Sequence, residues 1–319
     1  MGVNNNNSYI FKPKLYDLVY MKIVFLGTAS AFPTKDRNHT SILLRYGSEA
    51  ILFDCGEGTQ RQLRIAGESP MKITKIFITH WHGDHVLGLP GLLESMAMNN
   101  RQDLLEIFGP GGTKESIKHL FQALHIKPNY KLAIHEVDTR KSLIAINNKE
   151  YEVSAMYMKH KVPCLAYSFK EKDRYKINKD WVRKEKVQGL PALSKLQEGK
   201  DVTIKGKKVN AKDVTHIESG KKLTMIFDTE LMPSLVKFAK DSDLLICEGT
   251  FSHKIREKAR DHGHLTVKDA AKIAKSANVN KLIITHFSQR YKDTKELATE
   301  AKSVFKNVTL ARDFMEVNV

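Results

Sequence analysis

The stretch from Ile78 to Gly91, ITHWHGDHVLGLPG, contains three histidines and one aspartate within six residues, namely His80, His82, Asp84 and His85. They follow the apolar run KITKIFIT, which is typical of a buried strand. Imidazole and carboxylate groups crowded at a strand end are costly to desolvate unless something binds them. Alternate residues of an extended chain point the same way, so the two histidines of H-x-H can converge on one ion while Asp84 and His85 serve another. The spacing therefore predicts a two-metal site.

Three further candidate ligands end other apolar runs. His160 closes YEVSAMYMKH, Asp228 closes LTMIFD and His286 closes KLIITH. For any one of them a capping or core role would be the default interpretation. Because all three follow successive strand-like runs, we expect them to join the first four residues in a set of five histidines and two aspartates.

The cysteines argue against a thiolate site. The chain has three, all widely spaced and none in a CxxC pair, which are Cys55, Cys164 and Cys247. Isolated cysteines beside apolar residues are typical of buried side chains in a reducing compartment. Any metal is therefore expected to bind nitrogen and oxygen ligands.

The elements between these motifs alternate in type. Strand-like runs recur from Met21 onward, and helical patterns lie between several of them. In TKESIKHLFQAL the apolar residues recur at helical spacing, with Thr113 as the expected N-cap. In TVKDAAKIAKSA, Thr266 and Asp269 match the capping-box pattern. The mixture predicts an α/β or α+β layered sandwich.

Charge is unevenly distributed along the 319 residues. The 52 Lys and Arg against 36 Asp and Glu give a formal net charge of +16, which favours a polyanionic partner. About half of that excess lies between residues 170 and 212, which hold 14 basic and 6 acidic residues. We interpret about 170–205 as an insertion that projects from the core as a basic arm, not as a second folded domain, because it has few apolar residues and contains Gly189 and Pro191.

The rest of the chain is expected to be one domain over residues 21–319. Residues 1–20 are Asn-rich and non-periodic and are predicted to be a disordered extension. This segment lacks the apolar stretch of a signal peptide, and no apolar run approaches the roughly 20 residues of a membrane span. We therefore expect a cytoplasmic protein without membrane association.

Taken in order, these motifs resemble the metallo-β-lactamase superfamily and, within it, the ribonuclease Z family. Asp54 in ILFDCGEG precedes HWHGDH, and His160, Asp228 and His286 follow. Three features are similar to ribonuclease Z in particular: the loop PTKDRN, the long motif DCGEGTQRQL and the short motif HLT from His264. The arm also lies between His160 and Asp228, as in that family. The resemblance covers residues 21–319 and implies a four-layer αββα sandwich with a projecting arm.

For the site, the resemblance implies two Zn²⁺ ions per subunit. His80, His82 and His160 would bind one ion, Asp84, His85 and His286 the other, and Asp228 would bridge them. The implied reaction is attack of a metal-bound hydroxide on a phosphodiester, with Asp84 orienting or deprotonating the nucleophile. Asp54 would accept a hydrogen bond from a ligand histidine. His264 would donate a proton to the departing 3′-oxygen.

The implied substrate is precursor tRNA, from which the 3′ trailer is removed to leave a 3′-hydroxyl on the tRNA and a 5′-phosphate on the trailer. The arm would bind the phosphate backbone, and the PTKDRN loop would bind near the cleavage point. The candidate contacts are Arg183, Lys184, Lys186 and Lys195 on the arm and Lys35, Arg37 and Asn38 on the loop. The family is typically homodimeric, so a homodimer is expected. Two departures from the family pattern are the absence of a Gly-Pro-rich arm tip and Phe227 in place of a small residue before Asp228.

The sequence disfavours three other functions. A small-molecule esterase, sulfatase or phosphodiesterase of the same fold would need neither the arm nor the charge. A non-catalytic RNA-binding subunit is disfavoured because all seven candidate ligands are intact. A flavodiiron-type protein carries an acidic ligand at the second motif position, where this chain has His82.

Overall fold

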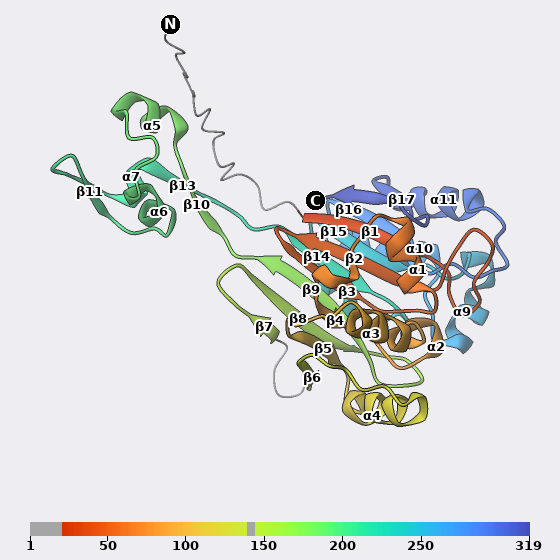
Figure 1. Cartoon of the computed structure of the whole chain (residues 1–319). Helices are drawn as coiled ribbons and strands as arrows, with labels where there is room; N and C mark the ends of the chain where they lie inside the picture. The colour runs from red at the N-terminus through yellow and green to blue at the C-terminus, as the bar shows by residue number, and fades with distance from the viewer. Residues whose placement is uncertain (1–20, 139–143) are drawn as a thin grey trace, which may run out of the picture.

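A computed structural model describes residues 21–138 and 144–319, so the predicted N-terminal extension lies outside the described residues. Two seven-stranded sheets face each other, and helices lie over the outer face of each (Figure 1). This arrangement is the four-layer αββα sandwich that the sequence resemblance implied.

The first sheet combines antiparallel and parallel pairs. The strands from β18 to β3 pair antiparallel, and those from β3 to β6 pair parallel. In spatial order they are β18 (Glu316–Asn318), β1 (Met21–Gly27), β2 (Ser41–Tyr46), β3 (Glu49–Phe53), β4 (Ile73–Phe77), β5 (Leu105–Gly109) and β6 (Leu132–Glu136).

The second sheet is also mixed. Its C-terminal strands pair parallel, and the hairpin of β8 with β9 joins them antiparallel. In spatial order the strands are β17 (Val308–Leu310), β16 (Lys281–Thr285), β15 (Leu244–Glu248), β14 (Lys222–Ile226), β9 (Cys164–Glu171), β8 (Tyr151–Met158) and β7 (Ile144–Asn147).

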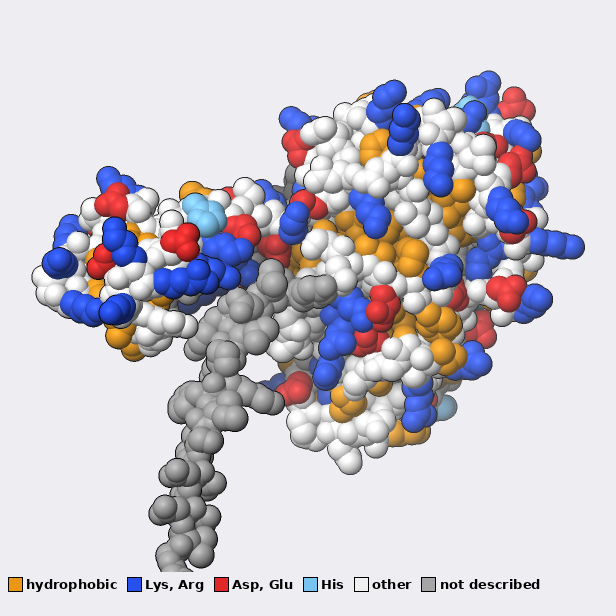
Figure 2. Space-filling model, turned by 90° about the horizontal axis from the view of Figure 1, so that it is seen from above, with side chains coloured by type: hydrophobic (Ala, Val, Ile, Leu, Met, Phe, Trp, Pro, Cys, Tyr) orange, Lys and Arg blue, Asp and Glu red, His pale blue; other side chains and the backbone are white. Residues whose placement is uncertain are grey.

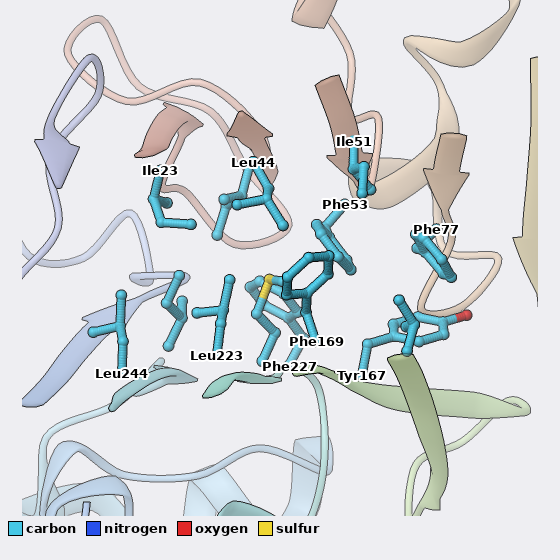
Figure 3. Close-up of a cluster of buried hydrophobic side chains, with 14 of the residues drawn as sticks. Ile23, Leu44, Ile51, Phe53, Phe77, Tyr167, Phe169, Leu223, Phe227 and Leu244 are labelled. Atoms are coloured by element: carbon cyan, nitrogen blue, oxygen red, sulfur yellow. The ribbon is translucent and has the colours of Figure 1, made fainter. Parts of the chain in front are cut away.

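The main core lies between the two sheets, where alternate residues of each strand point inward (Figure 3). Phe77 stacks on Phe53 with ring centroids 5.1 Å apart and meets the edge of Tyr167 at 5.0 Å. The Tyr167 hydroxyl donates to the carbonyl oxygen of Ile78 at 2.7 Å. This bond fixes the end of β4 at the point where the histidine motif begins.

Two further apolar clusters attach the helices to the outer faces of the sheets. The helices of the first half are α1 (Thr59–Ile65), the 3₁₀ turn η1 (Pro70–Lys72), α2 (Gly83–Val86), α3 (Leu89–Met98) and α4 (Thr113–Leu124). Those of the second half are α8 (Ser234–Ala239), the 3₁₀ turn η2 (His253–Ile255), α9 (Arg256–His262), α10 (Val267–Ser276) and α11 (Lys295–Lys302).

The two helix starts predicted from sequence had different outcomes. Helix α10 has the expected capping box between Thr266 and Asp269, which is confirmed. The expected N-cap of α4 was wrong, because Gly112 occupies that position and Thr113 is the first helical residue. The Thr113 hydroxyl instead donates to the carbonyl of Pro110 at 2.7 Å and accepts from the indole of Trp81 at 2.9 Å.

The segment between β9 and β14 projects from the sandwich (Figure 1). Strands β10 (Arg174–Ile177) and β13 (Thr215–Glu218) pair antiparallel as a stalk. The head beyond them contains α5 (Lys179–Glu185), α6 (Ala192–Gln197), β11 (Val202–Ile204), β12 (Lys207–Val209) and α7 (Ala211–Val214). We call residues 174–218 the arm.

The arm is longer than the expected 170–205 and is folded around an apolar cluster of its own. Val187 and Leu196 are almost fully buried there, with Val202, Ile204 and Val214 nearly so. The segment was expected to project from the core without being a second folded domain, and its few apolar residues gather from distant positions to form this small interior. Lys and Arg side chains cover much of its surface in Figure 2, with acidic residues between them.

No helix in the described ranges is both long and apolar enough to cross a membrane.

Candidate metal centre

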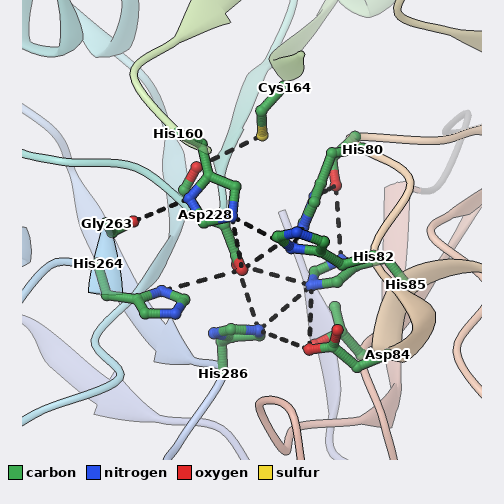
Figure 4. Close-up of polar contacts among 12 residues, drawn as sticks. His80, His82, Asp84, His85, His160, Cys164, Asp228, Gly263, His264 and His286 are labelled. Atoms are coloured by element: carbon green, nitrogen blue, oxygen red, sulfur yellow. Dashed lines mark hydrogen bonds and ion pairs between the residues drawn. The ribbon is translucent and has the colours of Figure 1, made fainter. Parts of the chain in front are cut away.

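The predicted metal ligands lie in loops or a short helix that follow the ends of strands. His80 and His82 follow β4, and α2 carries Asp84 and His85. The other three follow strands of the second sheet, with His160 after β8, Asp228 after β14 and His286 after β16. The structure brings all seven together at one edge of the sandwich (Figure 4).

Four of these residues form a first group. The His82 Nδ1 atom lies 3.0 Å from His80 Nε2 and 3.2 Å from His160 Nε2. The Oδ2 atom of Asp228 lies 3.6 Å from His80 Nε2 and 3.9 Å from His160 Nε2. These atoms are close enough together to share one ion.

The second group lies on the other side of Asp228. The Nε2 atoms of His85 and His286 are 3.3 Å apart, and Asp84 Oδ2 is 3.5 Å from the first and 3.6 Å from the second. The Oδ1 atom of Asp228 lies 3.2 Å from His286 Nε2 and 3.6 Å from His85 Nε2. One carboxylate thus faces both groups.

The remaining ring nitrogens have partners that determine their protonation. A carboxylate can only accept, so the Thr250 hydroxyl donates to Glu248 Oε2 at 2.6 Å and accepts from Nδ1–H of His286 at 2.9 Å. By the same rule the Thr79 hydroxyl donates to Asp54 Oδ2 at 2.9 Å and accepts from Nδ1–H of His80 at 3.0 Å. The Nε2 atoms of both histidines are therefore left without a proton when the rings are neutral.

The other two Nε2 ligands are oriented in the same way. Nδ1–H of His85 donates to Asp54 Oδ2 at 2.7 Å, and Nδ1–H of His160 donates to the carbonyl of Gly263 at 3.1 Å. Asp54 thus accepts a hydrogen bond from His85, one of the candidate ligand histidines.

The ring nitrogens and carboxylate oxygens at this site are arranged as metal ligands would be. The proton-free Nε2 atoms of His80 and His160 both face the Nδ1 atom of His82, which has at most one proton to donate, so a cation among the three nitrogens satisfies all of them where a hydrogen bond cannot. The buried Oδ1 atom of Asp228 has no hydrogen-bond partner among the described residues. A nitrogen and oxygen donor set of this kind fits Zn²⁺ and related divalent ions. The metallo-β-lactamase fold of this chain therefore carries His and Asp groups able to bind metal.

The electrostatic environment differs between the two groups. Burial, with some contribution from neighbouring His85, lowers the pKa of His80 well below its ordinary value, so that ring is neutral and can bind metal. Burial also acts to lower the pKa of His85, but Asp54 and Asp228 outweigh it and raise that pKa well above its ordinary value. The carboxylates thus stabilise a cation, whether proton or metal ion, at the Nε2 atom of His85.

Two site residues have unusual backbone conformations. Asp54 has φ 57° and His286 has φ 64°, values that non-glycine residues adopt mainly where the surroundings enforce them. Next to Asp54, a Cβ atom on Gly56 would lie 2.4 Å from the carbonyl oxygen of Asp84. Only glycine therefore allows the two loops to approach this closely.

His264 lies beside the two groups, two residues before Thr266, the N-cap of α10. Its Nδ1 atom is 3.2 Å from Glu248 Oε2 and 3.9 Å from Asp228 Oδ2. Burial acts to lower the pKa of His264, but Glu248 and Asp228 outweigh it and raise that pKa to about 9. With Nδ1–H directed at Glu248, the Nε2–H group is the one available to a substrate.

Sequence reasoning missed Glu248, Thr250 and Thr79. Glu248 is fully buried and accepts from His264, from the Thr250 hydroxyl and from the backbone N–H of Thr229 at 2.9 Å. One signal was present, because Glu248 ends strand β15 just as the three later ligands follow their strands. The threonine roles carried no such signal in the sequence.

The predicted substrate loop, residues 33–38, lies beside the segment that follows His286. The Arg37 guanidinium donates to the carbonyl of Tyr291 and lies 5.9 Å from the Phe287 ring centroid. The Asn38 amide donates to the carbonyl of Glu57 at 2.7 Å. Both side chains thus hold the loop in place, whereas Lys35 is exposed and has no side-chain partner within the described ranges.

The predicted arm residues all lie on the head of the arm. Arg183 and Lys184 are on α5, Lys186 ends that helix with φ 50°, and Lys195 is on α6. All four are exposed.

Comparison with known proteins places the chain in a family. The sequence model of the family described as "Anti-Pycsar protein Apyc1" matches residues 21–180, so the N-terminal half belongs to that domain family. That half contains the histidine motif and His160 but not Asp228 or His286.

Relatives that match nearly the whole chain are more informative. The chain is 40% identical over 300 residues to ribonuclease Z of Methanothermobacter thermautotrophicus, covering 94% of this chain and 97% of that protein. It is 43% identical over 269 residues to ribonuclease Z of Nanoarchaeum equitans, covering 84% of each. Among solved structures, the short form of human tRNase Z matches with a TM-score of 0.69 and 29% identity, covering 93% of this chain and 98% of that one. With its fold, its seven converging candidate ligands and this similarity over nearly the whole chain, the chain belongs to the ribonuclease Z family.

Proposed function

We propose that the chain is a metal-dependent endoribonuclease that removes the 3′ trailer from precursor tRNA. The products are a tRNA with a 3′-hydroxyl and a trailer with a 5′-phosphate. One observation supports the proposal: the chain is similar over nearly its whole length to ribonuclease Z proteins, and its seven candidate metal ligands converge in groups that could hold metal ions.

The metals are proposed to be two Zn²⁺ ions. His80, His82 and His160 would hold one, Asp84, His85 and His286 the other, and Asp228 would contribute one carboxylate oxygen to each. When bound, the ions would supply an activated water and neutralise charge that builds on the scissile phosphate.

Two residues of the chain would accept and donate protons during the reaction. Asp84 accepts a hydrogen bond from the attacking water and orients it for in-line attack. On the opposite side of the phosphorus, Nε2–H of His264 donates its proton to the departing 3′-oxygen. Glu248 holds the other nitrogen of that ring, which keeps Nε2–H directed outward. A positioned acid of this kind contributes about two to four orders of magnitude in rate.

Substrate recognition is proposed to be divided between two surfaces. Exposed Lys and Arg on the arm, including Arg183, Lys184, Lys186 and Lys195, would bind tRNA phosphates by charge, which suits an enzyme that must accept every tRNA. Lys35 would bind near the acceptor end, while Arg37 and Asn38 keep its loop in shape. Two finer points, homodimeric assembly and a cytoplasmic location, rest on the family resemblance; sedimentation of the purified protein tests the first.

The test is cleavage of a 3′-extended tRNA precursor by metal-replete protein, with both new ends mapped. We expect a 3′-hydroxyl on the tRNA and a 5′-phosphate on the trailer, and loss of cleavage in Asp84→Ala. Asp103→Ala, which removes an exposed carboxylate outside the site, is the matched control. Products with a 3′-phosphate, or full activity in Asp84→Ala, would contradict the proposal.

A further inference from the structure

A cavity of about 410 Å³ adjoins the metal centre on the side of His264. It lies between helices α9 and α10 and the loop after β14, and we call it the α9–α10 cavity. The residues that matter most for its chemistry are Leu231, Arg256, Arg260, His264 and Lys272. Its volume falls in the range of about 300–1,000 Å³ that is typical of small-ligand sites, so it suits one nucleotide better than a duplex.

The cavity has an excess of unpaired positive charge. Arg256, Arg260 and Lys272 are exposed, and none of their side chains forms an ion pair or hydrogen bond within residues 21–138 and 144–319. In contrast, two of the acidic residues that line the cavity are engaged. Glu230 pairs with Lys159 at 2.7 Å, and Asp269 caps helix α10.

Glu257 is the remaining acidic residue of the lining, so three free cations face one free carboxylate. A surface of this composition attracts an anion with more than one charge. Arginine guanidinium groups are particularly suited to bind phosphate oxygens in pairs.

His264 is shared between the cavity and the metal centre. Its Nδ1 atom faces Glu248 and Asp228, while its ring forms part of the cavity wall. The atom that receives a proton from His264 is the 3′-oxygen that leaves the phosphorus. The nucleoside that carries this oxygen must therefore lie against the ring, on the cavity side, whereas the trailer remains attached to the phosphorus at the metals.

We propose that the α9–α10 cavity binds the last nucleotide of the tRNA, the one whose 3′-oxygen is released. This assignment rests on the proposed function. Arg256, Arg260 and Lys272 bind the phosphates on its 5′ side, and the exposed Leu231 side chain offers an apolar surface to its base. Phosphate contacts fix register without reading sequence, so the cavity positions the end of any tRNA at the catalytic acid.

The test compares the binding of three RNAs to metal-replete protein. They are a tRNA that ends in its last nucleotide with a 3′-hydroxyl, the same tRNA shortened by that nucleotide, and a free trailer with a 5′-phosphate. The arm contacts both tRNAs equally, so their difference in affinity reports on the cavity. The variant is Arg256→Ala/Arg260→Ala, and the matched control is Lys258→Ala/Lys275→Ala, which removes two exposed charges from the same pair of helices outside the cavity.

Wild-type protein and the control should bind the complete tRNA more tightly than the shortened one. In the double arginine variant this difference in affinity should disappear. The affinity for the complete tRNA should fall about tenfold, and the affinities for the other two RNAs should change little. The slope of log affinity against log salt for the complete tRNA should fall by about 2. Hydrolysis of a small phosphodiester should be unchanged, because His264 and the metal ligands are intact.

Equal losses for both tRNAs, or a loss confined to the trailer, would overturn the assignment. Should the double variant fail to fold, Lys272→Ala, on the other helix, tests the same difference between the two tRNAs. The two proposals fail separately. If the wild-type protein does not cleave precursor tRNA, the proposed function is refuted. If the wild-type protein cleaves normally but the double arginine variant still binds the complete tRNA more tightly than the shortened one, only the assignment of the cavity is refuted.

Discussion

Replacement of Thr250 by valine would test how the site is held together. The Thr250 hydroxyl is buried, donates to Glu248 Oε2 at 2.6 Å and accepts from Nδ1–H of His286 at 2.9 Å. Valine keeps the shape of the side chain but can do neither. The change therefore breaks the hydrogen-bonded link between His286, a proposed metal ligand, and Glu248, the partner of the proposed catalytic acid His264.

The size of the effect follows from what each partner loses. Nδ1–H of His286 has no other acceptor among the described residues, and a buried polar group left unpaired costs about 1–3 kcal/mol. Glu248 loses one of three kinds of donor but keeps His264 and the backbone N–H of Thr229, so its added cost is smaller. We expect the metal-free protein to lose about 2–4 kcal/mol of unfolding free energy. Metal affinity should fall about 10- to 100-fold, because the His286 ring is no longer held with Nε2 toward the site.

Urea unfolding of the metal-free protein measures the first quantity, and competition with a chromogenic chelator measures the second. Thr285→Val is the matched control, since the buried Thr285 hydroxyl, one residue before His286, has no hydrogen-bond partner within the described ranges. That substitution should change neither quantity appreciably. If Thr250→Val behaved like Thr285→Val in both assays, the hydrogen-bond chain would have no role in holding the ligand.

Three further predictions follow from the site and the arm. His264→Ala should retain both metals by elemental analysis and lose about two to four orders of magnitude in single-turnover cleavage; a normal rate would remove His264 from catalysis. Ile177 and Thr215 are paired in the stalk of the arm, so a two-residue Asn-Gly turn can replace residues 178–214. This deletion should raise KM for precursor tRNA and spare hydrolysis of a small phosphodiester, whereas equal losses on both would argue against tRNA binding by the arm. Chelation of the metals should lower the melting temperature of the protein and added Zn²⁺ should restore it, because a ligand that binds the folded state stabilises that state. An unchanged melting temperature would mean that bound metal does not stabilise the fold.

Local patterns in the sequence were enough to locate most of the strands and the candidate ligands. A buried strand appears in the sequence as a short apolar run, and a polar residue soon after such a run lies at the C-terminal end of a strand in this fold. His160, Asp228 and His286 were found in this way, and the structure brings them to the same edge as the histidine motif. The capping box of α10 is equally local, since Thr266 and Asp269 are three residues apart.

These local patterns could not predict features that depend on contacts between residues far apart in the sequence. Thr113 has the residue type of an N-cap, but its hydroxyl is occupied by Trp81 and Pro110. The arm has an interior because apolar residues scattered from Val187 to Val214 meet in space.

The contacts that orient the metal centre are also non-local. Glu248 faces His264 across 16 residues, and Thr250 reaches His286 across 36. The residue types of the site were thus encoded along the chain, because each strand end is a local feature. Protonation and orientation of those residues depend on hydrogen bonds that form only when neighbouring strands pair within each sheet, as between Asp54 and His85 or Thr250 and His286. Asp228 meets His80 and His85 only when the second sheet packs against the first.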